Sequence, residues 1–385
     1  MWLKRGYREP PGRRWFSALV AAALLSPALS DAEYCEFLPA LVQIAEEIEP
    51  LSAFTPPGCL VLSSAAFHEY SRQMFLREVS AQRVRGEERI YKTLGVIPQN
   101  FNYADEVLHL FTASSSGFYD SLSDNIILAE GLDEIEALDT LTHELRHAQQ
   151  HRERRLEQIR DQSLTSDELL ARIALLEGDA MLFEERMRTH ERFGRLVQIA
   201  ITRRGSSRDA VKSTTAIALP EILKMLLEFP YSAGATYVRS KSLHLRERLS
   251  SLPRSSAEIL FAGYRHPLRP DPPYQASDDY FEDRVGAAFL GFWVAHWLNE
   301  REGKFAREAW RGDRVAIDSA TLHWLIGCPA RAQCERLGLI VARALGARFN
   351  SEVVRHAESA FALRSDQITV GVDIGDGSVT VRCRP

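Results

Sequence analysis

The stretch from residue 137 to residue 150 constrains this chain more than any other. Apolar residues recur there at steps of three and four, which predicts an α-helix with one apolar face. On such a helix His143 and His147 lie one turn apart on the same side, so two imidazoles can bind one metal ion. Glu144 lies beside them, where its carboxylate can act as general base on a water. The spacing predicts a hydrolytic metal site, with two solvated surface histidines as the alternative.

A third metal ligand is expected from a second helix. Thr165 and Glu168 form the pattern of a capping box, and apolar residues then recur at helical spacing. Glu177 lies on this helix, 30 residues after His147, which leaves room for a turn and an antiparallel return. A carboxylate donated there completes a His, His, Glu set and leaves one tetrahedral position for water. Metzincins need a glycine and a third histidine within six residues of the motif, whereas position 153 is Glu and no glycine occurs in this stretch, so that class is excluded.

These motifs resemble those of the gluzincin group of zinc metallopeptidases. They are most similar to a bacterial branch of exported peptidases with a later Glu-Gly-Asp-Ala motif, here residues 177–180. Further segments similar to that branch occur in the same order at 117–120, 229–234, 252–260 and 310–314. The resemblance spans residues 90 to 320. It implies a zincin-like catalytic core, Zn²⁺ as cofactor, His143, His147 and Glu177 as metal ligands, and Glu144 as general base.

The sequence departs from that family at two places. The family usually continues the first helix with His-Ala-Leu-x-Asp-Gln, whereas this chain has Gln149, Gln150 and His151 after Ala148. We expect His151 to be solvated rather than a ligand. The family also tends to have His-Pro directly after the segment that ends at 260, whereas His266 comes six residues later here. Phe261 and Ala262 therefore stand where the family has His-Pro.

A hydrogen-bond donor to the oxyanion is expected from a tyrosine or histidine, because gluzincin sites often use one. Tyr231 is our first candidate and Tyr237 and His266 are the alternatives, while simple packing of the tyrosine beside the metal helices stays open. Metal-binding histidines usually donate their second ring nitrogen to a carboxylate. Asp179 and Asp139 are both placed to accept such a bond.

The first thirty residues resemble a secretory signal, with basic residues, a short apolar core and small residues before a cleavage point. We therefore expect an exported protein, periplasmic or secreted, without a stable membrane span after cleavage. The whole chain carries −5, and loss of a leader with five bases and one acid leaves −9. A mildly acidic protein has no electrostatic reason to bind nucleic acid. The expected partner is a peptide or protein substrate.

The fold class expected is α+β and mainly α. A small antiparallel sheet should lie beside the helix with the two histidines, and the remainder should be mostly helical. The domains expected are a signal peptide over 1–30, a helical segment over 31–90, a catalytic domain over 91–350 and a β-hairpin tail over 351–385. The tail alternates around Asp376 and Gly377. It should form an edge element or a small appended sheet, tied by Cys383.

Several local elements follow from the pattern of apolar and turn residues. Helices are predicted over 37–45, 71–85, 102–111 and from Thr165 to about Gly194, and the helix from 219 should end at Pro230. The apolar run 285–298 reads as a buried helix, too short to span a bilayer. Residues 117–129 should form β structure whose last strand, 125–129, offers an open edge to an extended peptide. A plain hairpin that closes the sheet is the alternative.

The five cysteines suggest two oxidised pairs in an exported protein, Cys35 with Cys59 and Cys328 with Cys334, although the sequence alone does not determine the pairing. The reading that unites these features is an exported peptidase that hydrolyses peptide bonds with zinc. A non-catalytic exported zinc-containing module that binds peptide, or acts as a chaperone, is one alternative. A purely structural helical protein with a coincidental motif is the other. Substrate sequence, endo- or exo-cleavage and oligomeric state are left open.

Overall fold

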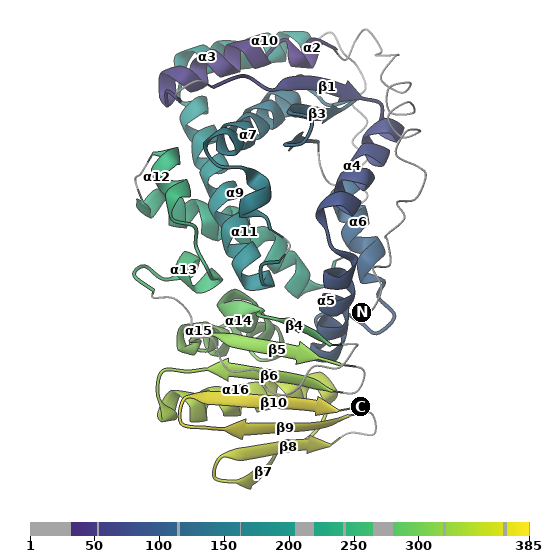
Figure 1. Cartoon of the computed structure of the whole chain (residues 1–385), viewed down its shortest axis with the longest axis vertical. Helices are drawn as coiled ribbons and strands as arrows, with labels where there is room; N and C mark the ends of the chain where they lie inside the picture. Colours follow the sequence, from purple (N-terminus) through teal and green to yellow (C-terminus); the bar gives the residue numbers. More distant parts are fainter. Residues whose placement is uncertain are drawn as a thin grey trace, which may run out of the picture.

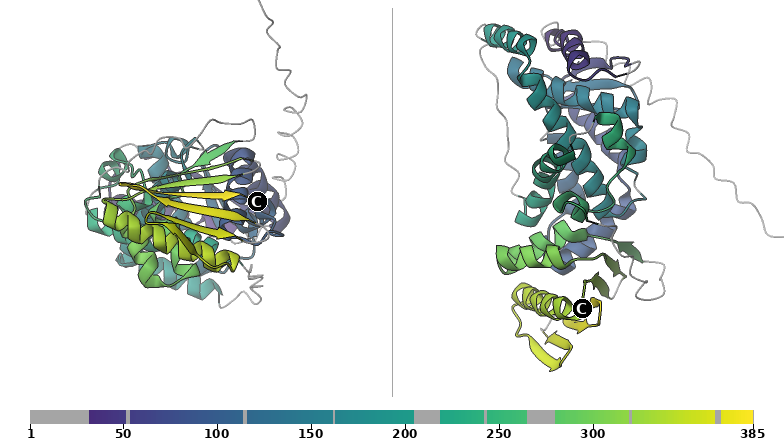
Figure 2. Two further views of the ribbon diagram at one scale, coloured as in Figure 1. Left: turned by 90° about the horizontal axis from the view of Figure 1, so that it is seen from below. Right: turned by 90° about the vertical axis from the view of Figure 1, so that its left-hand side faces the viewer.

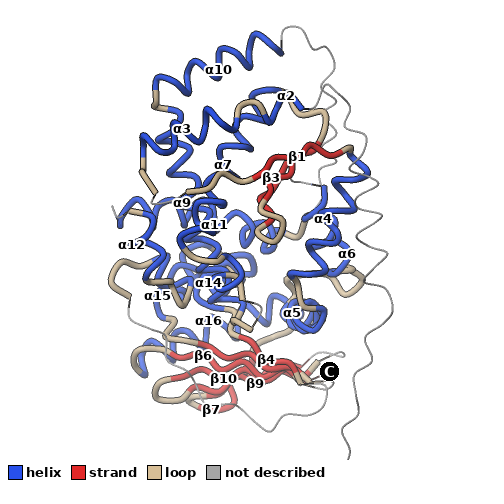
Figure 3. Tube along the Cα trace, turned by 45° about the horizontal axis from the view of Figure 1, so that its top comes forward, coloured by secondary structure: helices blue, strands red, loops and turns tan. Residues whose placement is uncertain are grey.

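The structure is a computed structural model that describes residues 32–51, 54–113, 116–161, 163–204, 219–241, 244–264, 280–318, 321–364 and 368–384. The molecule is elongated, with a helical region that contains a small sheet at one end and a larger sheet at the other end (Figure 1). The strands, drawn in red, form two sheets that are separated in space (Figure 3). The mixed architecture with more helix than strand confirms the expected class, α+β and mainly α.

Most of the helices lie in the first region. In chain order they are α2 (Ala32–Cys35), α3 (Leu38–Ile48), α4 (Ser64–Glu78), α5 (Ala81–Leu94), α6 (Tyr103–Ala113), α7 (Glu134–Glu153), α8 (Leu156–Ile159), α9 (Ser166–Arg188), α10 (Glu191–Arg204), α11 (Glu221–Lys241), α12 (Leu245–Ser250) and α13 (Ser256–Leu260). The single helix predicted over 71–85 is wrong, because Ser80 starts a new helix by accepting a hydrogen bond from the Arg83 amide. The helix predicted to reach Gly194 ends at Arg188 instead.

The small sheet lies beside α7 and has the order β1-β3-β2, formed by β1 (Gly58–Leu62), β3 (Asn125–Ala129) and β2 (Gly117–Asp120). β2 and β3 form the expected antiparallel hairpin. β1 was not predicted and pairs with β3 in parallel, so the sheet is mixed rather than antiparallel. The open edge expected for residues 125–129 is therefore wrong. β3 is the central strand, and the free edge beside α7 belongs to β2.

The helix α11 continues through Pro230, so the predicted end at this proline is also wrong. A proline inside a helix removes one backbone hydrogen bond, and packing must compensate for it. The compensation comes from close contact with α9. A Cβ atom on Gly178 would lie 2.1 Å from the carbonyl carbon of Gly234, so the two backbones touch where the helices cross. Both glycines belong to the segments similar to the peptidase branch.

The second region contains β4 (Phe281–Asp283), α14 (Gly286–Trp297), α15 (Glu300–Ala309), β5 (Asp313–Ile317), β6 (Leu322–Gly327), α16 (Arg331–Phe349), β7 (Val354–Ala357), β8 (Ala360–Arg364), β9 (Thr369–Ile374) and β10 (Ser378–Arg384). The strands form one sheet in the order β4-β5-β6-β10-β9-β8-β7. Helices including α16 lie on one face of the sheet (Figure 2). The predicted core helix is confirmed as α14, with Trp293 and Phe289 buried.

The β-hairpin predicted around Asp376 is confirmed as β9 and β10. It is not an edge element or an appended sheet, because β10 lies inside the sheet and pairs with β6. The apolar side chains of β10 alternate toward the core that includes α16, and this burial fixes its register. Cys383 is a buried free thiol and does not tie the tail to another cysteine.

A cluster of buried polar groups joins the two regions. The Asp167 carboxylate at the start of α9 accepts hydrogen bonds from the backbone N–H and hydroxyl of Ser256, at 2.8 and 2.5 Å. Its other oxygen lies 3.1 Å from Nε of Arg284. Asp313 accepts a bond from the Gly286 amide close by. Ser256, in the segment 252–260 similar to the family, therefore holds the start of α9, and Asp313 has a structural role at the start of α14.

Both predicted disulfides are confirmed, between Cys35 and Cys59 and between Cys328 and Cys334. In the part of the chain that the structure describes, no helix combines the length and apolar character needed to cross a bilayer. The predicted signal peptide over 1–30 and the candidate donor His266 lie outside the described residues.

Candidate metal centre

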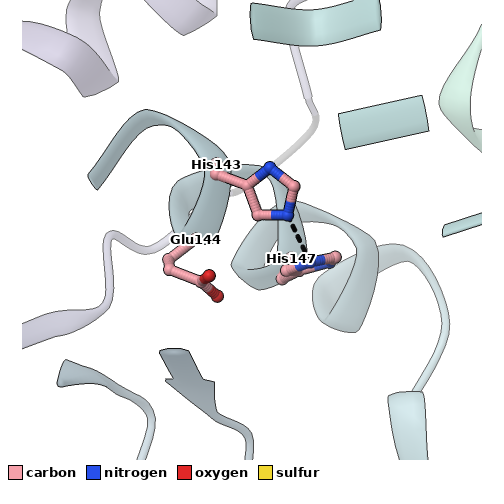
Figure 4. A group of neighbouring side chains, drawn as sticks. All are labelled: His143, Glu144 and His147. Atoms are coloured by element: carbon pink, nitrogen blue, oxygen red, sulfur yellow. Dashed lines mark hydrogen bonds between the residues drawn. The ribbon is translucent and has the colours of Figure 1, made fainter. Parts of the chain in front are cut away.

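Two helices of the first region position the candidate ligands. α7 carries His143, Glu144 and His147, and it is capped by Asp133, whose side chain accepts hydrogen bonds from the first-turn amides. α9 carries Glu177 and is capped by Thr165, which accepts a bond from the Glu168 amide as the capping pattern predicts. The imidazoles of His143 and His147 point to the same side of α7, and the carboxylate of Glu144 extends beside them (Figure 4). The predicted helical placement of all four residues is thus confirmed.

The structure brings three potential ligand atoms together. Nε2 of His143 and Nε2 of His147 are 3.2 Å apart. Oε2 of Glu177 lies 3.1 Å from the first nitrogen and 3.6 Å from the second. Four-coordinate zinc with bonds of about 2.0–2.1 Å requires ligand atoms roughly 3.3 Å apart. The triangle therefore has the size that one tetrahedral metal ion needs, and Glu177 faces both rings as predicted.

The outer nitrogen of each ring has a hydrogen-bond partner that fixes its proton. Nδ1 of His143 lies 2.6 Å from Oε1 of Glu184, a carboxylate that only accepts when ionised. Nδ1 of His147 lies 2.8 Å from Oε1 of Gln150, whose amide nitrogen donates to the Leu176 carbonyl. Both neutral rings must therefore carry their proton on Nδ1 and turn the lone pair of Nε2 inward. Two such lone pairs and a carboxylate oxygen repel one another unless a proton or a metal cation lies among them.

The titration of these groups shows the same demand for positive charge. Burial lowers the pKa of His143, but its hydrogen bonds to Glu177 and Glu184 outweigh burial and raise the pKa to about 11. Burial raises the pKa of Glu177, but the facing imidazoles of His147 and His143 bring it well below its usual range. Without a metal the cluster holds a proton tightly, and a divalent cation would replace that proton.

Glu144 is buried and is oriented by the small sheet. Its Oε2 accepts a hydrogen bond from the backbone N–H of Tyr119 on β2, at 2.8 Å. Ligand atoms of Glu144, His143 and His147 lie within 4.8 Å of one another, so this trio also forms a group able to hold a metal. The triangle with Glu177 is tighter and has inward lone pairs. Glu177 is therefore the better-placed candidate for the third ligand, and Glu144 lies beside the position between the two rings.

A network of buried charges holds α7 against α9. Arg146 is fully buried, and its guanidinium binds the Asp179 carboxylate through Nε at 2.8 Å and Glu49 of α3 through Nη2 at 2.9 Å. Arg248 also contacts Asp179, at 2.5 Å. The expected contact between Asp179 and a ligand histidine is wrong in this direct form. Asp179 instead accepts from Nε2 of Gln150 at 2.8 Å, and Gln150 in turn orients His147.

The sequence reasoning missed three of the residues that support the ligands. Glu184 lies in a charge-rich stretch interpreted as a solvated face, yet it is the carboxylate partner of His143. Its position two turns after Glu177 on α9 is the signal that was available. Gln150 and Arg146 lie on the predicted helix itself, and neither residue type indicates by spacing alone that it points inward. Asp139, the alternative partner for His143, binds Arg188 instead.

The candidate oxyanion donors lie in different surroundings. Tyr231 on α11 is 46% exposed, and the charges of Glu177 and Glu144, together with burial, raise the pKa of its phenol. Its phenol lies within electrostatic range of both glutamates and stays protonated, as a donor must. Tyr237 is half-buried, and its pKa responds to burial and to Glu258 rather than to the candidate ligands. Tyr231 therefore remains our candidate.

The structure also places two further residues, His151 and Arg314. His151 is not solvated, because its ring packs against Tyr119 with centroids 5.9 Å apart and Nδ1 accepts from the Leu156 amide. His151 packs beside β2 and is not among the converging candidate ligands. Arg314, in the segment 310–314 that resembles the peptidase branch, forms an ion pair with Glu282 at the larger sheet.

Comparison with known proteins gives no relative: no family model, no curated protein and no solved structure matches this chain. The residues and their geometry are therefore the whole basis for assigning a function.

Proposed function

We propose that this chain is an exported zinc metallopeptidase of the gluzincin type, with a zincin-like core formed by α7, α9 and the small sheet. The observation that carries the proposal is the convergence of three lone-pair atoms, on His143, His147 and Glu177, at the mutual distances of a tetrahedral metal site. Zinc suits two imidazoles and one carboxylate and leaves a fourth position open. A zinc ion held there supplies Lewis-acid chemistry that activates water and polarises a carbonyl.

The residues of the chain would perform the proton transfers. Glu144 has one oxygen fixed by the Tyr119 amide, and its other oxygen takes a proton from the attacking water and passes it to the leaving nitrogen. The phenol of Tyr231 would donate to the oxyanion. β2 is an edge strand beside Glu144, so an extended peptide can add to the sheet next to the metal position.

A turnover assay on an unfolded protein substrate tests this proposal. Purified protein, without residues 1–30, should cleave the substrate, lose activity with a chelator and regain it with zinc. The Glu144→Gln variant should lose activity by about 100- to 10,000-fold while it retains one zinc per chain. Glu136→Gln is the matched control, because Glu136 is exposed on the same helix and accepts a bond only from Ser116.

The outcomes separate the proposal from its alternatives. Bound zinc without turnover in the wild-type protein would favour the peptide-binding or chaperone-like module. Absence of bound zinc would favour a structural helical protein. Loss of zinc in Glu144→Gln would show that Glu144 is a ligand and that the assignment of Glu177 is incorrect.

A further inference from the structure

One arginine in the region of the candidate metal centre, Arg160, has a buried guanidinium N–H without a hydrogen-bond partner among the described residues. Arg160 follows α8, and its backbone N–H donates to the Leu156 carbonyl at 2.8 Å. The preceding Ile159 is fully buried in the core of the first region. Arg172 of α9 donates to the Ile159 carbonyl at 3.4 Å. The backbone beside Arg160 is therefore held by Arg172 of α9, which precedes Glu177 by five residues, about one and a half helical turns.

Among the residues that the structure describes, the guanidinium of Arg160 has no hydrogen-bond partner. Its Nε is buried from solvent and makes no hydrogen bond, and no carboxylate among the described residues pairs with its side chain. Two other arginines of this part of the chain are paired with carboxylates: Arg152 binds Asp124, and Arg172 binds Glu168. A buried N–H without a partner costs stability, and such a group in a native fold requires an explanation.

The electrostatic environment of Tyr231 relates Arg160 to the candidate metal centre. Glu177 and Glu144 raise the pKa of the Tyr231 phenol together with burial, whereas the charge of Arg160 opposes them. The phenol therefore lies within electrostatic range of two site glutamates and of this arginine. Arg160 has no direct contact with either glutamate, so it does not neutralise them as an ion-pair partner.

We propose that Arg160 binds a carboxylate of the peptide substrate at the Tyr231 side of the candidate metal centre. The proposal rests on the proposed function for the identity of the ligand as a peptide. A guanidinium matches a carboxylate with two parallel hydrogen bonds, and the edge formed by Nε and one Nη is suited to it. A carboxylate bound there would satisfy the unpartnered Nε–H. Its source is either the C-terminus of the substrate, which indicates exo-cleavage, or an acidic side chain.

Equilibrium binding separates these sources without requiring turnover. Fluorescently labelled peptides are titrated against zinc-loaded Glu144→Gln protein, in four forms: a free C-terminus, an amidated C-terminus, an internal Asp and the matching Asn. The Arg160→Gln change in this background should weaken binding of one carboxylate-bearing form by about 10- to 100-fold, because a charge-assisted hydrogen bond is lost. The amidated or Asn counterpart should change little. Arg160→Lys should restore part of the loss.

Arg155→Gln is the matched control, since Arg155 is exposed and precedes the same short helix. It should leave all four affinities unchanged. Equal affinity of the Arg160→Gln protein and its parent for every form would overturn the proposal. An equal loss for charged and uncharged forms would also overturn it, because it would show that Arg160 only balances the charge of the site glutamates. A selective loss with no turnover by the wild-type protein would instead support this subsite and contradict the peptidase.

Discussion

Two buried aspartates show how differently the two regions of the molecule are held together. Asp179 beside the candidate metal centre is surrounded by the cations of Arg146 and Arg248, and these outweigh burial and lower its pKa. Asp313 in the second region accepts hydrogen bonds from the indole N–H groups of Trp310 and Trp324. Burial dominates there and raises its pKa. The same side chain is thus stabilised as an anion in one region and disfavoured as an anion in the other.

The contrast indicates what each region is built for. Charged donors with fixed directions set the distance between α7 and α9, and that distance determines whether His143 and His147 face Glu177. The second region relies on an apolar core between its sheet and helices. Asp313 accepts hydrogen bonds from neutral donors there. Precise placement of a site requires directional contacts, whereas a scaffold can depend on volume and burial.

The largest expected effect comes from breaking the charge network itself. Arg146→Met removes the cation between Asp179 and Glu49 and leaves two buried carboxylates without their main partner. We expect the free energy of unfolding to fall by about 3–5 kcal/mol, measured by urea denaturation followed by circular dichroism. Arg195→Gln is the control, because its ion pair with Glu191 is exposed, and it should cost under about 0.5 kcal/mol. Similar values for both variants would contradict the contrast between the regions.

The crossing of α9 and α11 provides the next test, because no side chain separates the two backbones there. Gly178→Ala places a methyl group 2.1 Å from the backbone of Gly234, so the helices must move apart. The expected loss is about 1–3 kcal/mol in the same unfolding experiment. Gly194→Ala on α10 has open space around the added methyl and should instead gain up to about 1 kcal/mol. A neutral Gly178→Ala variant would mean that the helix spacing is adjustable.

A change at the partner of His143 should alter metal affinity more than stability. Glu184→Gln replaces the carboxylate that faces Nδ1 and weakens its hold on the ring, so zinc affinity should fall about 10- to 100-fold in a competition with a chromogenic chelator. Glu185→Gln provides the comparison at the adjacent position, where the side chain pairs with Arg239 at the surface. Its affinity should match the wild type. Equal losses in both variants would exclude a specific role for Glu184.

The smallest expected effect concerns pH and the polar cluster between the regions. Burial and the neighbouring Glu87 raise the pKa of Asp283 to about 7, from 3.8. The folded protein then binds more protons than the unfolded chain between about pH 4 and 7, so stability falls as the pH rises through this range. Asp283→Asn should flatten this decline in urea midpoint, whereas Asp376→Asn, at an 89% exposed side chain, should not. If the urea midpoint of Asp283→Asn declined with pH as steeply as that of the wild type, the decline could not be attributed to Asp283.

The parts of the fold that the sequence predicted are those with local signals. The spacing of His143 and His147, the cap at Thr165 and the turn at Asp376 each depend on a few neighbouring residues, and all three are confirmed. The failures involve distant partners. β1 forms only because β3 is available beside it, and α11 continues through Pro230 only because α9 packs against it.

In the candidate site too, the residues with local sequence signals were predicted and those that depend on distant partners were not. The three ligands and Glu144 were accessible from spacing and from the resemblance, because helical geometry places them without knowledge of the fold. The supporting residues were not, because Glu184, Gln150 and Arg146 acquire their partners only when α7 and α9 are packed together. A charged side chain on a helix is solvated in most sequences, and nothing local distinguishes Glu184 from its neighbour Glu185.

The most direct test of the central claim is the metal content of the purified protein. Elemental analysis after incubation with zinc and removal of the excess should give one zinc per chain in the wild type and in Glu144→Gln. It should give almost none in His147→Ala or Glu177→Ala, because each change removes one corner of the triangle. A wild-type protein that retains no zinc, or a Glu177→Ala protein that retains it fully, would contradict the account.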